Sequence, residues 1–142
     1  MESVIAGKFV CHEKLGDGGM GEVWKAWDRA FDRWVAIKFL KGTDEHELAR
    51  FRREAQMAGR LSHPNIAAVH EVGVDEGRHY IALQYVDGRT LAQFARRDRR
   101  LVARLLRDAA RAVAYAHAQG VIHRDLNPYA KQILMALGKQ NR

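Results

Sequence analysis

The sequence predicts an α+β fold: five antiparallel strands with one inserted helix, followed by helices. Three observations support this prediction. Short runs of alternating or β-branched residues fill the first part of the chain, one helical period interrupts them, and from Thr90 the pattern turns helical. With 142 residues, 47% of them hydrophobic, the chain can build the core of one domain of ordinary size. We expect the strand-rich part to end near residues 86–89.

The first three strands surround a glycine cluster. Residues 8–15 (KFVCHEKL) alternate loosely and residues 22–27 (EVWKAW) alternate again. The segment between these two strands is therefore a hairpin loop, and it contains Gly16, Gly18, Gly19 and Gly21. Residues 33–40 (RWVAIKFL) are rich in β-branched and aromatic side chains and form the third strand.

A helix follows the third strand. Thr43 can cap it, and the helix dipole favours the negative charges of its first turn, Asp44, Glu45 and Glu47. One buried stripe recurs at spacings of three and four residues and consists of Leu48, Phe51, Ala55 and Ala58. The segment SHPN (62–65) ends the helix, because Pro64 cannot continue it.

The rest of the chain adds two strands and two helices. The strands are predicted at residues 67–72 and 79–86, joined by a turn at Asp75, Glu76 and Gly77. A short helix at residues 91–96 (LAQFAR) precedes a long one at residues 101–119, and Gly120 suits the C-terminal cap of the long helix. The apolar face of the long helix comprises Val102, Leu105, Leu106, Ala109, Val113 and Ala116.

Charge and cysteine content exclude several classes of site. The net charge of +7 comes mostly from arginines clustered at residues 50–53 and 96–111. We interpret them as solvated helix faces rather than a nucleic-acid surface, because no aromatic residue beyond Phe94 interleaves with the second cluster to stack on bases. The single cysteine, Cys11, cannot form an internal disulfide, and the seven histidines lack metal-binding spacing. With no run of about eighteen apolar residues, the chain is expected to be soluble and cytoplasmic.

Three motifs in order suggest phosphate chemistry. Gly16, Gly18 and Gly21 have the GxGxxG spacing that lets backbone amides approach phosphate oxygens, and a strand rather than a helix follows them, which argues against a dinucleotide site. Lys38 in VAIK should face opposite to Ile37 and Phe39. It is either a solvent-facing strand lysine or a phosphate contact held by an acidic partner. Glu54 is that partner, unless it only pairs with Arg50 one turn back.

Together with HRDL at residues 123–126, these motifs resemble the protein kinase family, specifically the bacterial serine/threonine kinases of the eukaryotic type. The resemblance covers about residues 9–134. It implies a small, ATP-binding lobe at residues 1–86 and the start of a helical large lobe at residues 87–142. The cofactor would be ATP with Mg²⁺, and the substrate a protein hydroxyl.

The resemblance also assigns roles to individual residues. Asp125 would be the catalytic base, oriented by His123 and Arg124, and Lys38 would contact the phosphates and pair with Glu54. Leu83 resembles the gatekeeper, and the segment from Gln84 to Val86 resembles the hinge whose backbone binds adenine. The remaining ATP contacts would be Leu15, Gly16, Gly18, Gly21, Val23 and Ala36.

The chain departs from the family pattern after HRDL. Ala130 occupies the position of the metal-binding Asn, so no metal ligand is intact there, and Asn127 and Gln132 are only weak substitutes. No DFG motif follows before Arg142. We therefore expect a truncated kinase domain that is inactive or weakly active as this fragment. The alternative is a nucleotide-binding or interaction module of pseudokinase type. In both cases the long helix would expose its apolar stripe, which a partner chain could cover.

Overall fold

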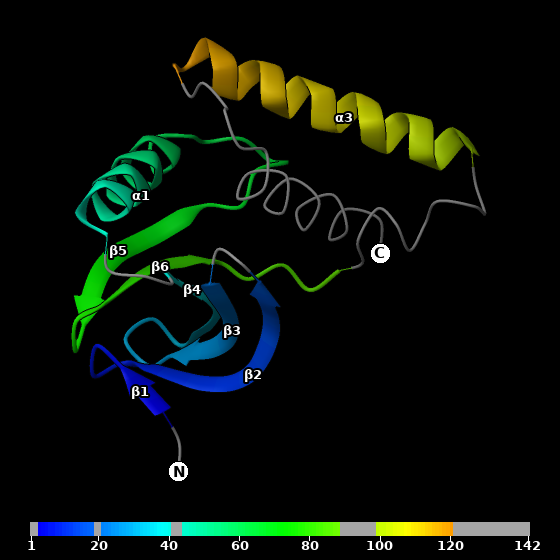
Figure 1. Ribbon diagram of the computed structural model, residues 1–142. Coiled ribbons are helices and arrows are strands. Elements are labelled where there is room, and N and C mark those ends of the chain that lie inside the picture. Colours follow the sequence, from blue (N-terminus) through cyan, green and yellow to red (C-terminus); the bar gives the residue numbers. More distant parts are fainter. Residues whose placement is uncertain (1–2, 19–20, 41–43, 89–98, 121–142) are drawn as a thin grey trace. The chain divides into compact units, whose positions relative to one another are not determined.

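The computed structural model describes residues 3–18, 21–40, 44–88 and 99–120 of the chain. They belong to two compact units (Figure 1). The first unit contains residues 1–59 and 69–85, and the second contains residues 60–68 and the chain from Val86 onward. The predicted helix at residues 91–96 lies outside the described residues.

The first unit is built on an antiparallel sheet of six strands, in the order β1-β2-β3-β4-β6-β5. The strands are β1 (Ser3–Ile5), β2 (Phe9–Gly18), β3 (Gly21–Asp28), β4 (Arg33–Phe39), β5 (Val69–Asp75) and β6 (Arg78–Gln84). All five predicted strands are present, and the expectation of only five was wrong because β1 adds a sixth. The chain turns from β1 into β2 through Ala6 and Gly7, which both have positive φ (50° and 69°). A three-residue strand followed by an Ala-Gly turn carries little sequence signal.

One face of the sheet holds the core of this unit. Alternate residues of β3, β4 and β6 point into it, among them Ile37, which is fully buried, and Phe39, which is 3% exposed. Lys38 lies between these two residues and is only half-buried. The predicted alternation of Lys38 with its neighbours is therefore confirmed. The other members of the core cluster are Ile5, Phe9, Ala26, Val35, Tyr80 and Ala82.

Polar contacts close the curled sheet between its two ends. Lys8, in the turn before β2, donates to Glu71 Oε1 of β5 at 2.7 Å, and Tyr80 Oη donates to Glu71 Oε2 at 2.9 Å. The backbone N–H of Ala6 donates to Asp75 Oδ1 at 3.1 Å. Burial, and then the hydrogen bond to Glu71, raise the pKa of the Tyr80 hydroxyl above its ordinary value. Glu71 thus joins strands from opposite ends of the strand order.

Gly73 leaves the space that Tyr80 occupies. A Cβ at position 73 would lie 2.6 Å from Tyr80 Oη and 2.7 Å from its Cζ, closer than nonbonded atoms approach. The two residues are paired across β5 and β6. A side chain at position 73 would therefore displace the tyrosine that holds Glu71.

The helix α1 (Glu45–Ala58) packs against β5 (Figure 1). Its N-cap is Asp44, whose Oδ1 accepts from the backbone N–H of His46 at 2.9 Å. The expectation that Thr43 caps the helix was therefore wrong, since the aspartate next to it takes this role. Ala55 and Ala58 of the predicted stripe are buried, while Leu48 and Phe51 are half-buried.

The second unit contains the long helix α3 (Arg99–Ala118). Tyr115 Oη accepts from the backbone N–H of Ser62 at 3.1 Å, and its ring centroid lies 5.2 Å from that of His63. Gly120 has a φ of 84°, and its N–H donates to His117 O, which confirms it at the C-terminal end of the helix.

The apolar face of α3 is not exposed as expected. Leu105 and Ala116 are buried, as is Ala112, which the predicted stripe omitted. Leu106 is an exception, with 52% of its surface exposed. The expectation of a bare stripe was therefore wrong for these positions. This burial removes the reason for expecting a partner chain over these positions.

A polar cluster holds the two strands of the β2–β3 hairpin together next to its loop. Glu22 accepts from Trp24 Nε1 at 3.1 Å and lies 3.4 Å from Lys14 Nζ, which also donates to Asp17 at 2.9 Å. The hydrogen bond from Trp24 holds the pKa of the Glu22 carboxyl below its ordinary value, and the cations Lys14 and Arg78 act in the same direction. The hydrogen bond to Asp17 raises the pKa of Lys14. These contacts tie the two strands together just before the glycine loop.

The sheet closure can be tested with Glu71→Gln, which keeps the side chain's size and removes its charge. We expect the free energy of unfolding to fall by about 1 kcal/mol, because the carboxylate is partly exposed and a hydrogen bond or ion pair of this kind contributes modestly. Denaturant unfolding followed by tryptophan fluorescence measures the change. Glu76→Gln, in the exposed β5–β6 turn, is the control and should have no effect. An equal loss in a Lys8→Met background would show that the ion pair is not the cause.

The hairpin cluster predicts a pH dependence. The pKa of Glu22 is lowered from its ordinary value of 4.5, so its contribution to hairpin stability is complete above pH 4.5 and is lost as the pH falls through the lowered pKa. The Nε1–H nuclear magnetic resonance signal of Trp24 should therefore shift with a midpoint below pH 4.5. The signals of Trp27 and Trp34 are internal controls. Glu22→Gln should abolish the shift, and its persistence in that variant would contradict the assignment.

Candidate functional site

The face of the sheet opposite the core carries most of the predicted site residues. Gly16 pairs with Val23, Val23 with Lys38, and Lys38 with Ile81. Because residues directly opposite each other in an antiparallel sheet project to the same face, these four residues form one row, here called the lysine row. Neighbouring strands lie about 4.8 Å apart, so the row places Gly16 and Lys38 about 10 Å apart.

A second row lies beside it on the same face. Lys25 pairs with Ala36, and Ala36 with Leu83, which form the alanine row. Ala36 is only 1% exposed, whereas Leu83 is half-buried. The structure therefore brings Val23, Ala36, Lys38 and Leu83, predicted from distant motifs, onto one surface of one sheet.

The glycine loop begins at the end of the lysine row. Gly18 pairs with Gly21, and Gly21 has a φ of 129°, a conformation that residues with a side chain rarely adopt. Leu15 lies in a β-bulge between Lys14 and Gly16 and is 39% exposed. The bulge adds one unpaired residue to β2 and so determines which face of the sheet the residues before and after it project to. The glycines thus start within one strand spacing of Val23.

Glu54 lies on α1, which stands on the side of the sheet that carries Lys38. A Cβ at Gly59, just past the helix, would lie 4.0 Å from Val69 Cβ, and Val69 continues the alanine row through its pairing with Leu83. Arg50 Nε donates to Glu54 Oε1 at 3.2 Å, the i,i+4 pair considered above. Lys38 and Glu54 each have an interaction partner in the structure. Their mutual pairing stays a prediction.

The hinge prediction falls at the end of β6. Gln84 closes the strand and pairs with Val35. Val86 is 4% exposed and begins the second unit. The catalytic-loop predictions, Asp125 with His123 and Arg124 and the weak metal candidates Asn127 and Gln132, lie outside the described residues.

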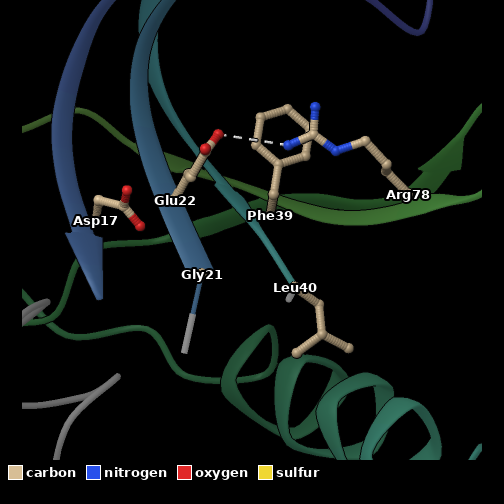
Figure 2. Close-up of a pocket in the computed structure, with 6 residues that line it drawn as sticks. All are labelled: Asp17, Gly21, Glu22, Phe39, Leu40 and Arg78. Carbon is tan, nitrogen blue, oxygen red and sulfur yellow. Dashed lines mark ion pairs between the residues drawn. The ribbon is translucent and has the colours of Figure 1, made fainter. Parts of the chain in front are cut away.

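A pocket of about 210 Å³ opens near the glycine loop but toward the other face (Figure 2). The Arg78 guanidinium lies 3.9 Å from the Phe39 ring centroid and 3.5 Å from Glu22. Glu22 and Phe39 belong to the alternation that faces the core, opposite to Lys38. Besides Gly21, the pocket shares no residue with the predicted ATP site, and its lining consists of Asp17, Gly21, Glu22, Phe39, Leu40 and Arg78.

Sequence reasoning did not single out Lys25, which also lies on the predicted site face. Lys25 lies two positions beyond Val23 and therefore points to the same face, opposite Ala36. The strand alternation contained this signal.

The described residues bring no three His, Cys, Asp or Glu side chains together as a metal site. Among them, no helix is long and apolar enough to span a membrane.

Comparisons with known proteins point to one family. The model of the protein kinase domain family matches residues 9–136. Serine/threonine-protein kinase PrkC of Bacillus subtilis is 36% identical over 132 residues, which is 88% of this chain and 20% of that protein. Serine/threonine-protein kinase PknJ of Mycobacterium tuberculosis is 42% identical over 146 residues, which is 99% of this chain and 25% of that protein. The chain thus spans a quarter or less of the length of these relatives.

A solved structure shows the same fold. The crystal structure of the Mycobacterium tuberculosis PknI kinase domain superimposes with a TM-score of 0.74 at 34% identity, over 90% of this chain and 54% of that one. The curled antiparallel sheet with its two helices corresponds to a kinase small lobe and the start of the large lobe, which confirms the predicted fold apart from the extra strand. This chain belongs to the protein kinase family, and its relatives named here are bacterial serine/threonine kinases.

Proposed function

We propose that the sheet face formed by the lysine and alanine rows binds ATP, and that the protein transfers the γ-phosphoryl group to serine or threonine hydroxyls of a protein substrate. The observation that carries the proposal is the lysine row itself. It places the start of a glycine loop, an apolar Val23 and a cation at residue 38 side by side on a face that the core does not use. Bacterial serine/threonine kinases among the relatives support the substrate class.

Each part of the face has a chemical task in this proposal. Backbone N–H groups of the glycine loop donate to phosphate oxygens, and the Lys38 ammonium neutralises part of their charge. Glu54 orients that ammonium. Val23 and Ala36 offer apolar contact to the adenine, with Leu83 at its edge and the Gln84–Val86 backbone as its hydrogen-bonding partner.

The transfer step would use Asp125. The substrate hydroxyl oxygen forms a bond to the γ-phosphorus while the bond from that phosphorus to the β,γ-bridging oxygen breaks, and the hydroxyl proton passes to the Asp125 carboxylate. When bound, Mg²⁺ neutralises charge on the β- and γ-phosphates. The described part of the chain presents no cluster of ligands for it.

A second candidate is nucleotide binding without transfer, the pseudokinase type. Ala130 favours it, because an alanine methyl group cannot coordinate a metal where the family pattern has Asn. Both candidates require the same nucleotide-binding face. They differ in whether bound ATP depends on Mg²⁺ and whether it is consumed.

Lys38→Met tests the nucleotide site. We expect ATP affinity to fall about ten- to hundredfold, because a charge-assisted contact to phosphate is lost. Isothermal titration of the 142-residue chain measures the affinity. Lys8→Met removes the same charge at the sheet closure and should leave ATP affinity unchanged. Equal ATP binding by the wild type and Lys38→Met would contradict the assignment of this face.

Asp125→Asn separates transfer from binding. If the chain transfers phosphate, this variant should lose incorporation of labelled phosphate into a generic basic protein while its ATP affinity stays within about twofold, since the residue acts on the hydroxyl and not on the nucleotide. Wild-type ATP binding that needs no Mg²⁺, with no phosphate incorporation, would instead favour the pseudokinase type. Incorporation that survives in Asp125→Asn would contradict the role of this carboxylate.

A further inference from the structure

Lys25 is held between two aromatic rings. Its Nζ lies 4.4 Å from the ring centroid of Trp34 and 4.9 Å from that of Tyr85. Both distances are within the range in which a cation is attracted to the face of an aromatic ring. Among the ion pairs of the described residues, none involves Lys25. The aromatic rings are therefore the partners that the structure shows for this ammonium group.

The Trp34 ring is itself fixed by its neighbours. The Trp27 ring packs edge to face against it at 5.1 Å between centroids and 76°, and the His12 ring does the same at 5.0 Å and 77°. Trp27 and Trp34 are paired directly across β3 and β4. Such edge-to-face contacts add to the burial of the rings. Trp34 is therefore a rigid support for Lys25, although it is 38% exposed.

Tyr85 is placed where the sheet's own hydrogen bonds stop. Gln84 is the last residue of β6 and pairs with Val35. Tyr85 follows it and has no strand pairing. A side chain that contacts the Tyr85 ring therefore holds in place the first residue that the strand pairing of β6 does not reach. That residue is the middle of the segment, Gln84 to Val86, to which the proposed function assigns the adenine hydrogen bonds.

We propose that Lys25 is a positioning residue for adenine recognition, which rests on the proposed ATP site. By bridging the rings of Trp34 and Tyr85, it fixes Tyr85 and with it the backbone groups of Gln84 and Val86 that meet the base. Lys25 shares the alanine row with Ala36, beside the base, whereas Lys38 lies in the row that begins the glycine loop. Its ammonium group is directed at the rings. The effect of Lys25 should therefore concern the base and not the phosphates.

The test compares three ligands: ATP, adenosine and inorganic tripolyphosphate. For Lys25→Met we expect ATP and adenosine affinities to fall by the same factor, about three- to tenfold, while tripolyphosphate affinity is unchanged. Lys25→Arg, which can also stack on both rings, should retain wild-type values. Lys8→Met controls for the loss of one positive charge. Lys38→Met should instead lower the affinity for tripolyphosphate most and the affinity for adenosine least.

A second variant keeps the test decisive. Tyr85→Leu should weaken ATP and adenosine to the same degree as Lys25→Met, and the double variant should be no weaker than either single one, because both remove one interaction. Amide hydrogen exchange at Tyr85 and Val86, measured without nucleotide, should quicken in both single variants. Loss of tripolyphosphate affinity in Lys25→Met, or additive effects in the double variant, would overturn the inference. A wild-type chain that binds neither ATP nor adenosine would overturn the proposed function itself.

Discussion

The pairing register of β3, β4 and β6 is the constraint on which both the core and the candidate site depend. Ile37 and Phe39 are buried in the core while Lys38 between them lies on the opposite face. A slip of one residue would exchange these faces and place the lysine charge in the apolar core, which costs several kcal/mol unless the charge is compensated. The burial of the two apolar side chains therefore also places the cation. The same register therefore determines both the stability of the sheet and the geometry of the site.

The ends of the sheet are held by charge and hydrogen bonds rather than by a strand ladder. Glu71 accepts from Lys8 and from Tyr80, which bring the start of the chain against β5. Gly73 makes this possible because it leaves room for the tyrosine ring. On the inner strand β3, Glu22 accepts a hydrogen bond from Trp24 beside the glycine loop. Two carboxylates with aromatic and cationic partners thus tie the turn before β2 to β5 and hold the two strands beside the glycine loop together.

Strand alternation was sufficient to predict the five longer strands and the direction of Lys38, because a period of two depends only on neighbouring residues. The sixth strand was missed because three residues before an Ala-Gly turn hold too little pattern. Thr43 was wrongly chosen as the N-cap of α1 because the next residue, Asp44, is also of a type that caps helices. The burial of Ala112 depends on what packs on α3 and not on local period. Lys25 was overlooked because its two aromatic partners come from β4 and from the residue after β6, which only the register brings together.

The two rows on the site face also determine how a bound nucleotide would lie. Val23 and Lys25 are two residues apart on β3, a separation of about 7 Å along the strand. The lysine row at Val23 contains the glycine and the cation, and the alanine row at Lys25 contains small and apolar groups beside the end of β6. Under the proposed function, the phosphates therefore lie near Gly16 and Lys38 of the first row, and the base lies between Val23 and the second row, so the nucleotide runs along the strands. The Lys25 contact with Tyr85 then fixes the far end of that axis, and the Glu22 cluster fixes the near end.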